Sequence, residues 1–334
     1  MTADPSEKPA ITLAISGAGG AVGYGLVFRI AAGAMFGAHQ QVSLRLLEHS
    51  DQMQRLQATA MELTDCAFPL LKSFIVTDDP LEAFAGADWI VLLAGSPVDV
   101  PRPSRIDVLK ANGEIYVEHG RAINKVSPAA RILVVAAPCN ANCMIAMSQA
   151  HDVPKQHWFA LNRLDRMRAT ALIAQKAGVP VSQVNRVIVW GNHSELMYVD
   201  FHNAFIGDSP AHEVITDVQW AHESLQKAVT HRSAEIFRLR GRSPIATATQ
   251  AILGTIHSIV TPTPFERRFG AAVYSDGSYG VPKGLIFGFP VRTEDGKQWS
   301  IEQGLYLDEF AQTKIDRNVA ELEYEAVLAQ EWFG

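Results

Sequence analysis

Five short apolar runs, each followed by a stretch with helical character, occupy the chain from Ile11 to about Ala137. In order, they are ITLAISG, VSLRLLEH, SFIVTD, WIVLLAG and RILVVAA. Near-continuous apolar runs are typical of strands buried on both faces, and parallel neighbours need a crossover helix between them. We therefore expect a doubly wound α/β domain in which helices cover both faces of a parallel sheet.

The second half of the chain has a different pattern. After about Asn162, strand-like pieces such as AAVYSD and GLIFGFPV are mixed with longer helical segments, roughly 165–177, 217–240 and 245–262. A chain of 334 residues exceeds the size at which one hydrophobic core usually stops growing. We predict two domains, residues 1–160 and residues 161–334, the second α+β, with a shared interface where a ligand can lie.

Composition excludes several classes of function. The formal net charge is −6 and no run of Lys or Arg occurs, so a nucleic-acid partner is not expected. The N-terminal MTADPSEKPA lacks a basic segment before an apolar stretch, and no apolar run has the length of a membrane span. We therefore expect neither export nor membrane insertion. Cys66, Cys139 and Cys143 are odd in number and lack metal-ligand spacing, which favours a reducing cytoplasm and no metal site.

A glycine-rich loop, GAGGAVG, joins the first apolar run directly to the helical stretch AVGYGLVFRIAA. Gly17 permits a tight turn, Gly20 lets backbone N–H groups approach a pyrophosphate, and Gly23 lets the helix pack closely on the strand. Glu48 ends the second run, where an acidic side chain binds an adenosine ribose diol and repels a 2′-phosphate. An ordinary turn and a solvated glutamate are the alternatives. The combination favours a Rossmann-type domain that binds NAD.

Five longer segments occur in the order found in malate dehydrogenases: MELTDCAFPLL, NGEIYVEHGRAI, NRLDRMRA, VWGNHSELM and GSYGVPKGLIFGFPV. From about Ile11 to about Ala329 the chain resembles the cytosolic-type branch of the lactate/malate dehydrogenase superfamily. The resemblance implies an NAD-dependent oxidoreductase that interconverts a 2-hydroxy acid and a 2-oxo acid. It also implies a homodimer, because residues 53–71 and the helix starting near Asp165 resemble elements that pair across the dimer axis in this family.

The resemblance assigns catalytic roles to three residues. His193 in WGNHS matches the general acid/base, a role that suits the near-neutral pKa of imidazole. Asp165 matches the aspartate that orients this histidine, and Arg168 matches the arginine that binds the substrate carboxylate as a bidentate fork. A purely structural salt bridge is the alternative for Asp165 and Arg168. Arg163 and Arg166 are interpreted as structural or interface residues.

The segment SPVDVPRPSRIDVL departs from the family pattern. Arg105 matches the second of two loop arginines, which helps to polarise the reacting carbonyl. The first arginine, which binds the distal carboxylate of malate, is replaced by Val98, and the loop is interpreted as one residue longer before Arg105. Arg102 is the nearby replacement, but Pro101 and Pro103 flank it and restrict its backbone.

Two further departures affect the predicted pocket. Family members have Gly-Asn-Pro after the fifth strand, whereas this chain has Ala137 in place of the asparagine that touches substrate and cofactor. Asn140, which matches a later asparagine of the segment, is assigned with Ala137 to the cofactor site. Ser243 is retained at the substrate wall, but Pro244 and Ile245 replace small or hydroxyl residues.

These departures predict a malate-dehydrogenase-like enzyme with altered specificity for the distal group of its 2-oxo acid. Two alternatives remain open. The first is an authentic malate dehydrogenase that uses Arg102 for the distal carboxylate. The second is a weakly active paralogue that binds dinucleotide and has a regulatory role.

Overall fold

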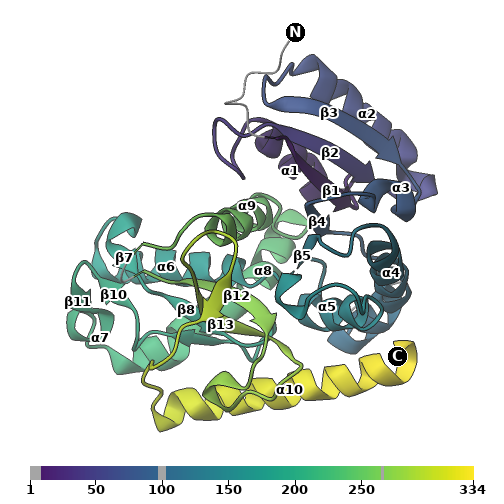
Figure 1. Cartoon of the computed structure of the whole chain (residues 1–334). Helices are drawn as coiled ribbons and strands as arrows, with labels where there is room; N and C mark the ends of the chain where they lie inside the picture. The colour runs from purple at the N-terminus through teal and green to yellow at the C-terminus, as the bar shows by residue number, and fades with distance from the viewer. Residues whose placement is uncertain (1–8, 97–102, 265–266) are drawn as a thin grey trace.

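The computed structural model describes residues 9–96, 103–264 and 267–334. A single nine-stranded sheet runs through both halves of the molecule, in the order β14-β13-β12-β6-β5-β4-β1-β2-β3 (Figure 1). The six strands of the N-terminal half pair in parallel: β1 (Ile11–Ser16), β2 (Val42–Leu47), β3 (Leu71–Thr77), β4 (Trp89–Leu92), β5 (Arg131–Val134) and β6 (Trp158–Ala160). The predicted doubly wound fold is confirmed.

The C-terminal half continues the same sheet with antiparallel strands. They are β12 (Phe269–Tyr274), which pairs with β6, then β13 (Ile286–Thr293) and β14 (Trp299–Ile301). Short strands form two small additional sheets: β7 (Val184–Asn185), β8 (Ile188–Trp190), β9 (Tyr198–Asp200), β10 (Phe205–Ile206) and β11 (Ser209–Pro210). Mixed strands and helices in this half confirm its predicted α+β class.

Helices surround the sheet in both halves. Those of the N-terminal half are α1 (Ala21–Ala31), α2 (Met53–Asp65), α3 (Pro80–Phe84), α4 (Arg105–Val126) and α5 (Cys139–Ser148). Those of the C-terminal half are α6 (Arg163–Ala177), α7 (Ala211–Val214), α8 (Gln226–Arg240), α9 (Ala246–Val260) and α10 (Glu309–Phe333). None of the described helices is long and apolar enough to cross a membrane.

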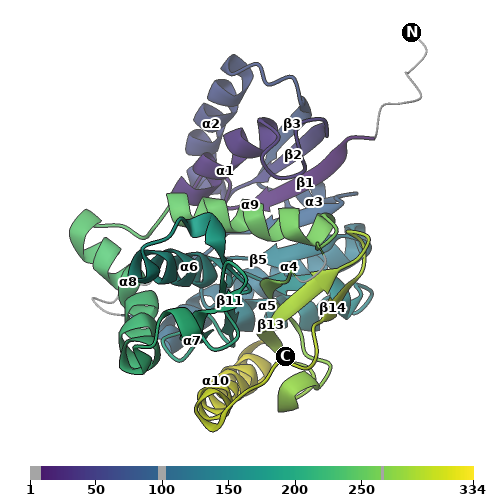
Figure 2. The same ribbon diagram turned by 90° about the vertical axis from the view of Figure 1, so that its left-hand side faces the viewer.

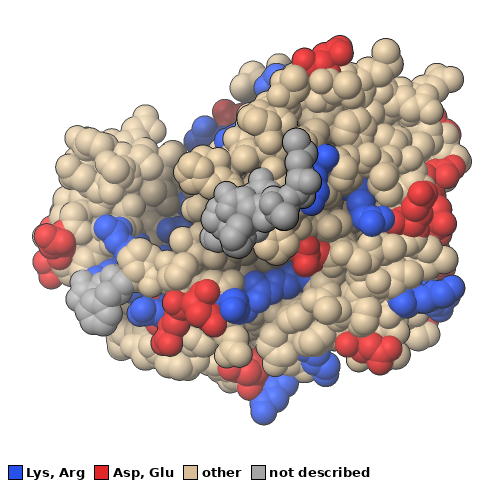
Figure 3. Space-filling model, turned by 45° about the horizontal axis from the view of Figure 1, so that its top comes forward, with Lys and Arg blue, Asp and Glu red and all other residues tan. Residues whose placement is uncertain are grey.

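Two helices connect the halves. Helix α9 packs against both α1 and α6, whereas the long α10 contacts α4, α5 and β9. Figure 2 shows α10 at the bottom of the molecule and α9 between α1 above and α6 below. On the face shown in Figure 3, acidic and basic side chains are interspersed among uncharged ones.

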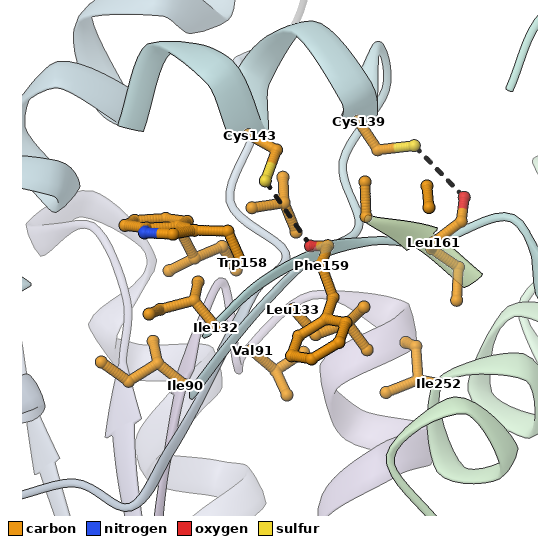
Figure 4. Close-up of a cluster of buried hydrophobic side chains, with 14 of the residues drawn as sticks. Ile90, Val91, Ile132, Leu133, Cys139, Cys143, Trp158, Phe159, Leu161 and Ile252 are labelled. Carbon is orange, nitrogen blue, oxygen red and sulfur yellow. Dashed lines mark hydrogen bonds between the residues drawn. The ribbon is translucent and has the colours of Figure 1, made fainter. Parts of the chain in front are cut away.

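The main hydrophobic core lies around the central strands and includes two of the cysteines (Figure 4). The Cys139 thiol donates to the Leu161 carbonyl oxygen at 3.2 Å, and the Cys143 thiol donates to the Phe159 carbonyl oxygen at 3.7 Å. Burial raises the pKa of Cys139 to about 12 and that of Cys143 well above its usual range. Both cysteines are therefore protonated core residues at neutral pH.

His119 on α4 is buried between Phe84 and Tyr116, and its Nδ1 has no hydrogen-bond partner among the described residues. Burial lowers its pKa to about 4. Because the unfolded chain binds this proton near pH 6.5, the free energy of unfolding should fall as the pH drops from about 6.5 to about 4. Between pH 7 and pH 5 the expected loss from this group is about 2 kcal/mol.

Urea unfolding of wild type and His119→Phe at both pH values measures this contribution. From pH 7 to pH 5, the free energy of unfolding of His119→Phe should fall by about 2 kcal/mol less than that of wild type. His39→Gln, at an exposed position, should show the same fall as wild type. Equal losses in wild type and His119→Phe would contradict the prediction.

Candidate active site

The glycine-rich loop between β1 and α1 forms a closely packed turn. Gly17 has φ +70°, and a Cβ added there would lie 2.9 Å from the backbone N of Ala94 at the end of β4. A Cβ at Gly23 would lie 2.4 Å from the Ala18 carbonyl oxygen. Glycine is therefore required at both positions, for backbone conformation at the first and for close helix packing at the second. Gly20 lies at the N-terminal cap of α1.

A cavity of about 760 Å³ opens beside this loop at the carboxyl ends of β1, β2 and β4. Gly17, Gly20 and Glu48 all line it. Oε2 of Glu48 accepts a hydrogen bond from Gly19 N at 2.9 Å, and Oε1 accepts one from His49 N at 3.0 Å. A carboxylate has about four lone-pair positions, so these two contacts orient Glu48 and leave acceptor capacity for a ribose diol. The cavity, the glycine loop that lines it and the carboxylate fit a dinucleotide.

Glu48 makes cofactor choice testable. A 2′-phosphate would meet the carboxylate as a like charge, so kcat/KM with NADH should exceed that with NADPH by at least about tenfold. Glu48→Gln should narrow the difference, because it removes the charge and keeps the size of the side chain. Steady-state rates with both cofactors measure the preference, and equal or better use of NADPH by wild type would remove Glu48 from its assigned role.

His193, which follows β8, lies next to Asp165 and Arg168 of α6 in the C-terminal half. Nδ1 of His193 lies 2.5 Å from Oδ2 of Asp165, and Nη1 of Arg168 lies 3.2 Å from Oδ1 of the same carboxylate. Asp165 is fully buried in the first turn of α6, whereas the His193 side chain, after β8, is 27% exposed. Because a carboxylate only accepts, Nδ1 carries the proton, and Nε2 is the nitrogen available for proton exchange with a ligand.

Arg168 is held on a second side by α8. Its Nη2 donates to Oγ of Ser233 at 2.6 Å, and its Nη1 donates to the carbonyl oxygen of Val229 at 3.4 Å. Burial is the main influence on the pKa of Arg168 and lowers it; Asp165 opposes this shift and Arg232 adds to it. A guanidinium that is charged, largely buried and fixed in orientation can bind a small carboxylate through two parallel hydrogen bonds.

Arg105 makes its contacts in this structure with protein groups near His193. It begins α4 behind the Ser104 cap, and its guanidinium donates to the backbone oxygen of His193 at 2.7 Å and to Oδ1 of Asn192 at 2.8 Å. Its Nε forms an ion pair with the buried Glu325 of α10. In this structure Arg105 therefore holds the segment that carries His193 and neutralises Glu325, and its role toward a reacting carbonyl stays a prediction from the resemblance.

Asn140 also makes its contacts with protein groups. Its Nδ2 donates to the Ile286 carbonyl oxygen at 2.8 Å, and its Oδ1 accepts from His193 N at 3.2 Å. The side chain is fully buried, so it supports the histidine segment and does not line the dinucleotide cavity. The sequence pattern assigned Asn140 to the cofactor site, whereas its hydrogen-bond partners in this structure are the backbone of β13 and of His193.

The remaining predicted positions lie at the edges of the site or outside the described residues. Ala137 is exposed at the end of β5, and its carbonyl oxygen accepts from Nδ2 of Asn112 at 2.9 Å. Ser243 is exposed in the segment that leads into α9. Val98 and Arg102 lie outside the described residues, so their roles stay predictions from the sequence.

Three residues that the sequence reasoning missed belong to this arrangement: Ser233, Asn192 and Glu325. Asn192 directly precedes His193 in the WGNHS segment, so that segment marks it in the sequence. Ser233 and Glu325 reach the site from α8 and α10, 65 residues from Arg168 and 220 residues from Arg105. No local pattern marks such distant partners.

Comparison with known families covers nearly the whole chain. Residues 11–159 match the lactate/malate dehydrogenase NAD binding domain, and residues 162–331 match the lactate/malate dehydrogenase alpha/beta C-terminal domain. The first match shows that NAD is the cofactor.

Solved structures agree with this result. The malate dehydrogenase of Naegleria fowleri is 36% identical with a TM-score of 0.92, and the match covers 97% of this chain and 99% of that one. Trichomonas vaginalis lactate dehydrogenase, in complex with NADH and oxamate, is 32% identical with the same TM-score and the same coverage. Malate dehydrogenase from Plasmodium falciparum, at 18% identity and a TM-score of 0.79, shows the same fold over 97% of this chain and 100% of its own. The chain therefore belongs to the lactate/malate dehydrogenase family and is an NAD-dependent 2-hydroxyacid dehydrogenase.

Proposed function

We propose that this enzyme reduces a 2-oxo acid whose distal group differs from that of oxaloacetate, with His193 as general acid/base. The observation that carries the role of His193 is the buried carboxylate of Asp165, which contacts both His193 at 2.5 Å and Arg168 at 3.2 Å. In this proposal, one buried carboxylate orients both the nitrogen that exchanges the proton and the cation that binds the substrate carboxylate. These two groups would contact the carbonyl oxygen and the 1-carboxylate, which all 2-oxo acids share.

Each residue of this set has a distinct task. Bound NADH supplies the hydride. During reduction, Nε2 of His193 gives its proton to the carbonyl oxygen of the substrate, and during oxidation of the hydroxy acid it takes the proton back. Asp165 fixes the imidazole orientation and stabilises the imidazolium. Arg168 binds the 1-carboxylate, and its contact with Ser233 limits the guanidinium to one orientation before the substrate arrives.

The distal group is assigned from the sequence alone. The chain resembles both a malate dehydrogenase and a lactate dehydrogenase at more than 30% identity, so likeness does not favour one distal group. Val98 is apolar and cannot pair with a distal carboxylate. A charge left uncompensated in a desolvated site costs on the order of 2–5 kcal/mol of binding. We therefore expect oxaloacetate to be a poor substrate.

A panel of 2-oxo acids with NADH, followed at the absorbance of the reduced cofactor, tests this expectation. A 2-oxo acid with another distal group should exceed oxaloacetate by at least about tenfold in kcat/KM. Val98→Arg should shift activity toward oxaloacetate. Efficient oxaloacetate reduction by wild type that Arg102→Ala abolishes would instead make Arg102 the distal carboxylate reader and the enzyme an authentic malate dehydrogenase. Absence of turnover with every acid, despite NADH binding, would favour the regulatory paralogue.

We also propose a homodimer in the cytoplasm. The dimer is supported by the likeness of residues 53–71 and the start of α6 to pairing elements of the family. Met61 on α2 is a large hydrophobic side chain that is 70% exposed, as expected of a contact that a second copy would cover. Sedimentation at micromolar concentration distinguishes the dimer from a monomer. The cytoplasm is favoured by three free cysteines, of which Cys66 is exposed.

A further inference from the structure

The backbone that carries His193 lies directly against helix α10. Gly191 has φ +100°, and a Cβ added there would lie 2.2 Å from Oδ1 of Asn318. Asn192 N donates to the same Oδ1 at 2.5 Å, and His193 N donates to Oδ1 of Asn140 at 3.2 Å. The N–H groups of Asn192 and His193 are thus bound by buried asparagines, one of them on the C-terminal helix.

Arg105 binds the other side of the same segment. Its Nη1 donates to the backbone oxygen of His193 at 2.7 Å, and its Nη2 donates to Oδ1 of Asn192 at 2.8 Å. Its Nε donates to Oε1 of Glu325, and its Nη2 also lies 3.3 Å from Oε2 of that residue. The guanidinium therefore forms hydrogen bonds both to Asn192 and His193 and to Glu325 of α10.

Glu325 determines where this guanidinium lies. Its side chain is 1% exposed, and its Oε2 also accepts from Nδ2 of Asn192 at 3.1 Å. Arg105 is the only cation that pairs with it among the residues that the structure describes. A buried carboxylate needs a charged partner, so Glu325 draws Arg105 away from solvent and fixes its orientation.

We propose that Glu325 is a positioning residue, which acts on the proton transfer through Arg105 and the backbone of His193. The inference rests on the proposed role of His193. Asp165 contacts the imidazole ring of His193 only at Nδ1. The position of Nε2 also depends on the backbone of His193, to which the ring is attached. Displacement of a reacting group by about 1 Å can lower a rate by about 10²-fold, so support for this backbone is part of the catalytic apparatus.

The test compares wild type, Glu325→Gln and Glu325→Asp as full-length proteins with NADH bound. Glu323→Gln, at an exposed position on the same helix, is the matched control. Amide hydrogen exchange is measured in a peptide that contains Asn192 and His193, together with kcat for the best 2-oxo acid, the Kd for NADH and the Tm. Glu325→Gln keeps the size of the side chain and removes its charge.

Glu325→Gln should speed exchange in this peptide and lower kcat roughly 10- to 100-fold, with an unchanged Kd for NADH. Glu325→Asp keeps the charge on a shorter side chain, so its amide exchange and its kcat should lie between those of Glu325→Gln and wild type. Glu323→Gln should match wild type in both measurements. Unchanged exchange at His193 would overturn the inference. So would a lower Tm with unchanged kcat, or an equal loss in Glu323→Gln. If wild type reduces no 2-oxo acid, the proposed function fails, but the exchange result still decides the role of Glu325.

Discussion

Replacing His193 with glutamine is expected to lower kcat for 2-oxo acid reduction by roughly 10²–10⁴-fold. The amide side chain cannot exchange a proton at neutral pH, whereas the remaining carboxylate-binding arginine still holds the substrate. KM for the 2-oxo acid should therefore change much less than kcat. Stopped-flow measurement of NADH oxidation in a single turnover isolates the chemical step from product release.

Asp165→Asn is the companion variant. An amide can donate to Nδ1 of His193, which favours the tautomer that lacks a proton on Nδ1 and carries it on Nε2, and a neutral amide cannot stabilise the imidazolium. A loss of kcat in the same direction is therefore expected. Titration of NADH fluorescence serves as the control, because neither residue lines the dinucleotide cavity. Wild-type kcat in His193→Gln would contradict the assignment of the general acid.

Arg168→Gln is expected to weaken the use of every 2-oxo acid. Removing one partner of a buried charged contact costs about 2–5 kcal/mol, which corresponds to roughly 30- to 5,000-fold in kcat/KM. Arg168→Lys keeps the charge beside Asp165 but loses the bidentate fork, so its loss should lie near the lower end of this range.

Comparison with a second cation on the same helix controls for a general charge effect. Lys176→Gln removes a surface pair with Asp217, of 2.9 Å, at the far end of α6 and should change kcat/KM by less than about threefold. If Arg168→Lys retained wild-type kcat/KM for all 2-oxo acids, Arg168 would be a structural partner of Asp165 and another cation would bind the carboxylate.

Local patterns were sufficient to predict the elements of the fold. The apolar runs became β1 to β5, and the predicted helix over about 165–177 is α6, Arg163–Ala177. Such elements are encoded by burial and periodicity within a few residues. The antiparallel continuation from β6 to β12 could not be predicted, because strands separated by more than 100 residues carry no local mark of their pairing.

The site was predicted in its residue types better than in its contacts. His193, Asp165 and Arg168 lie together as the resemblance implied, because a shared motif preserves the geometry within one family. Arg105 and Asn140 were also found close to the site, but their expected partners were ligands. Each side chain satisfies its buried polar atoms with the groups that tertiary packing brings nearest, and the sequence does not show those groups.

The strand order has a consequence for recombining this protein with its relatives. Strand β6 lies between β5 and β12, and Trp158, Phe159 and Ala160 are all buried. A polypeptide cut after residue 160 would leave the outer edge of β6 unpaired, which invites edge-to-edge aggregation. A chimera of two family members must instead keep the alignment of Ala160 with Ala272, because a slip of one residue would turn each following side chain to the opposite face.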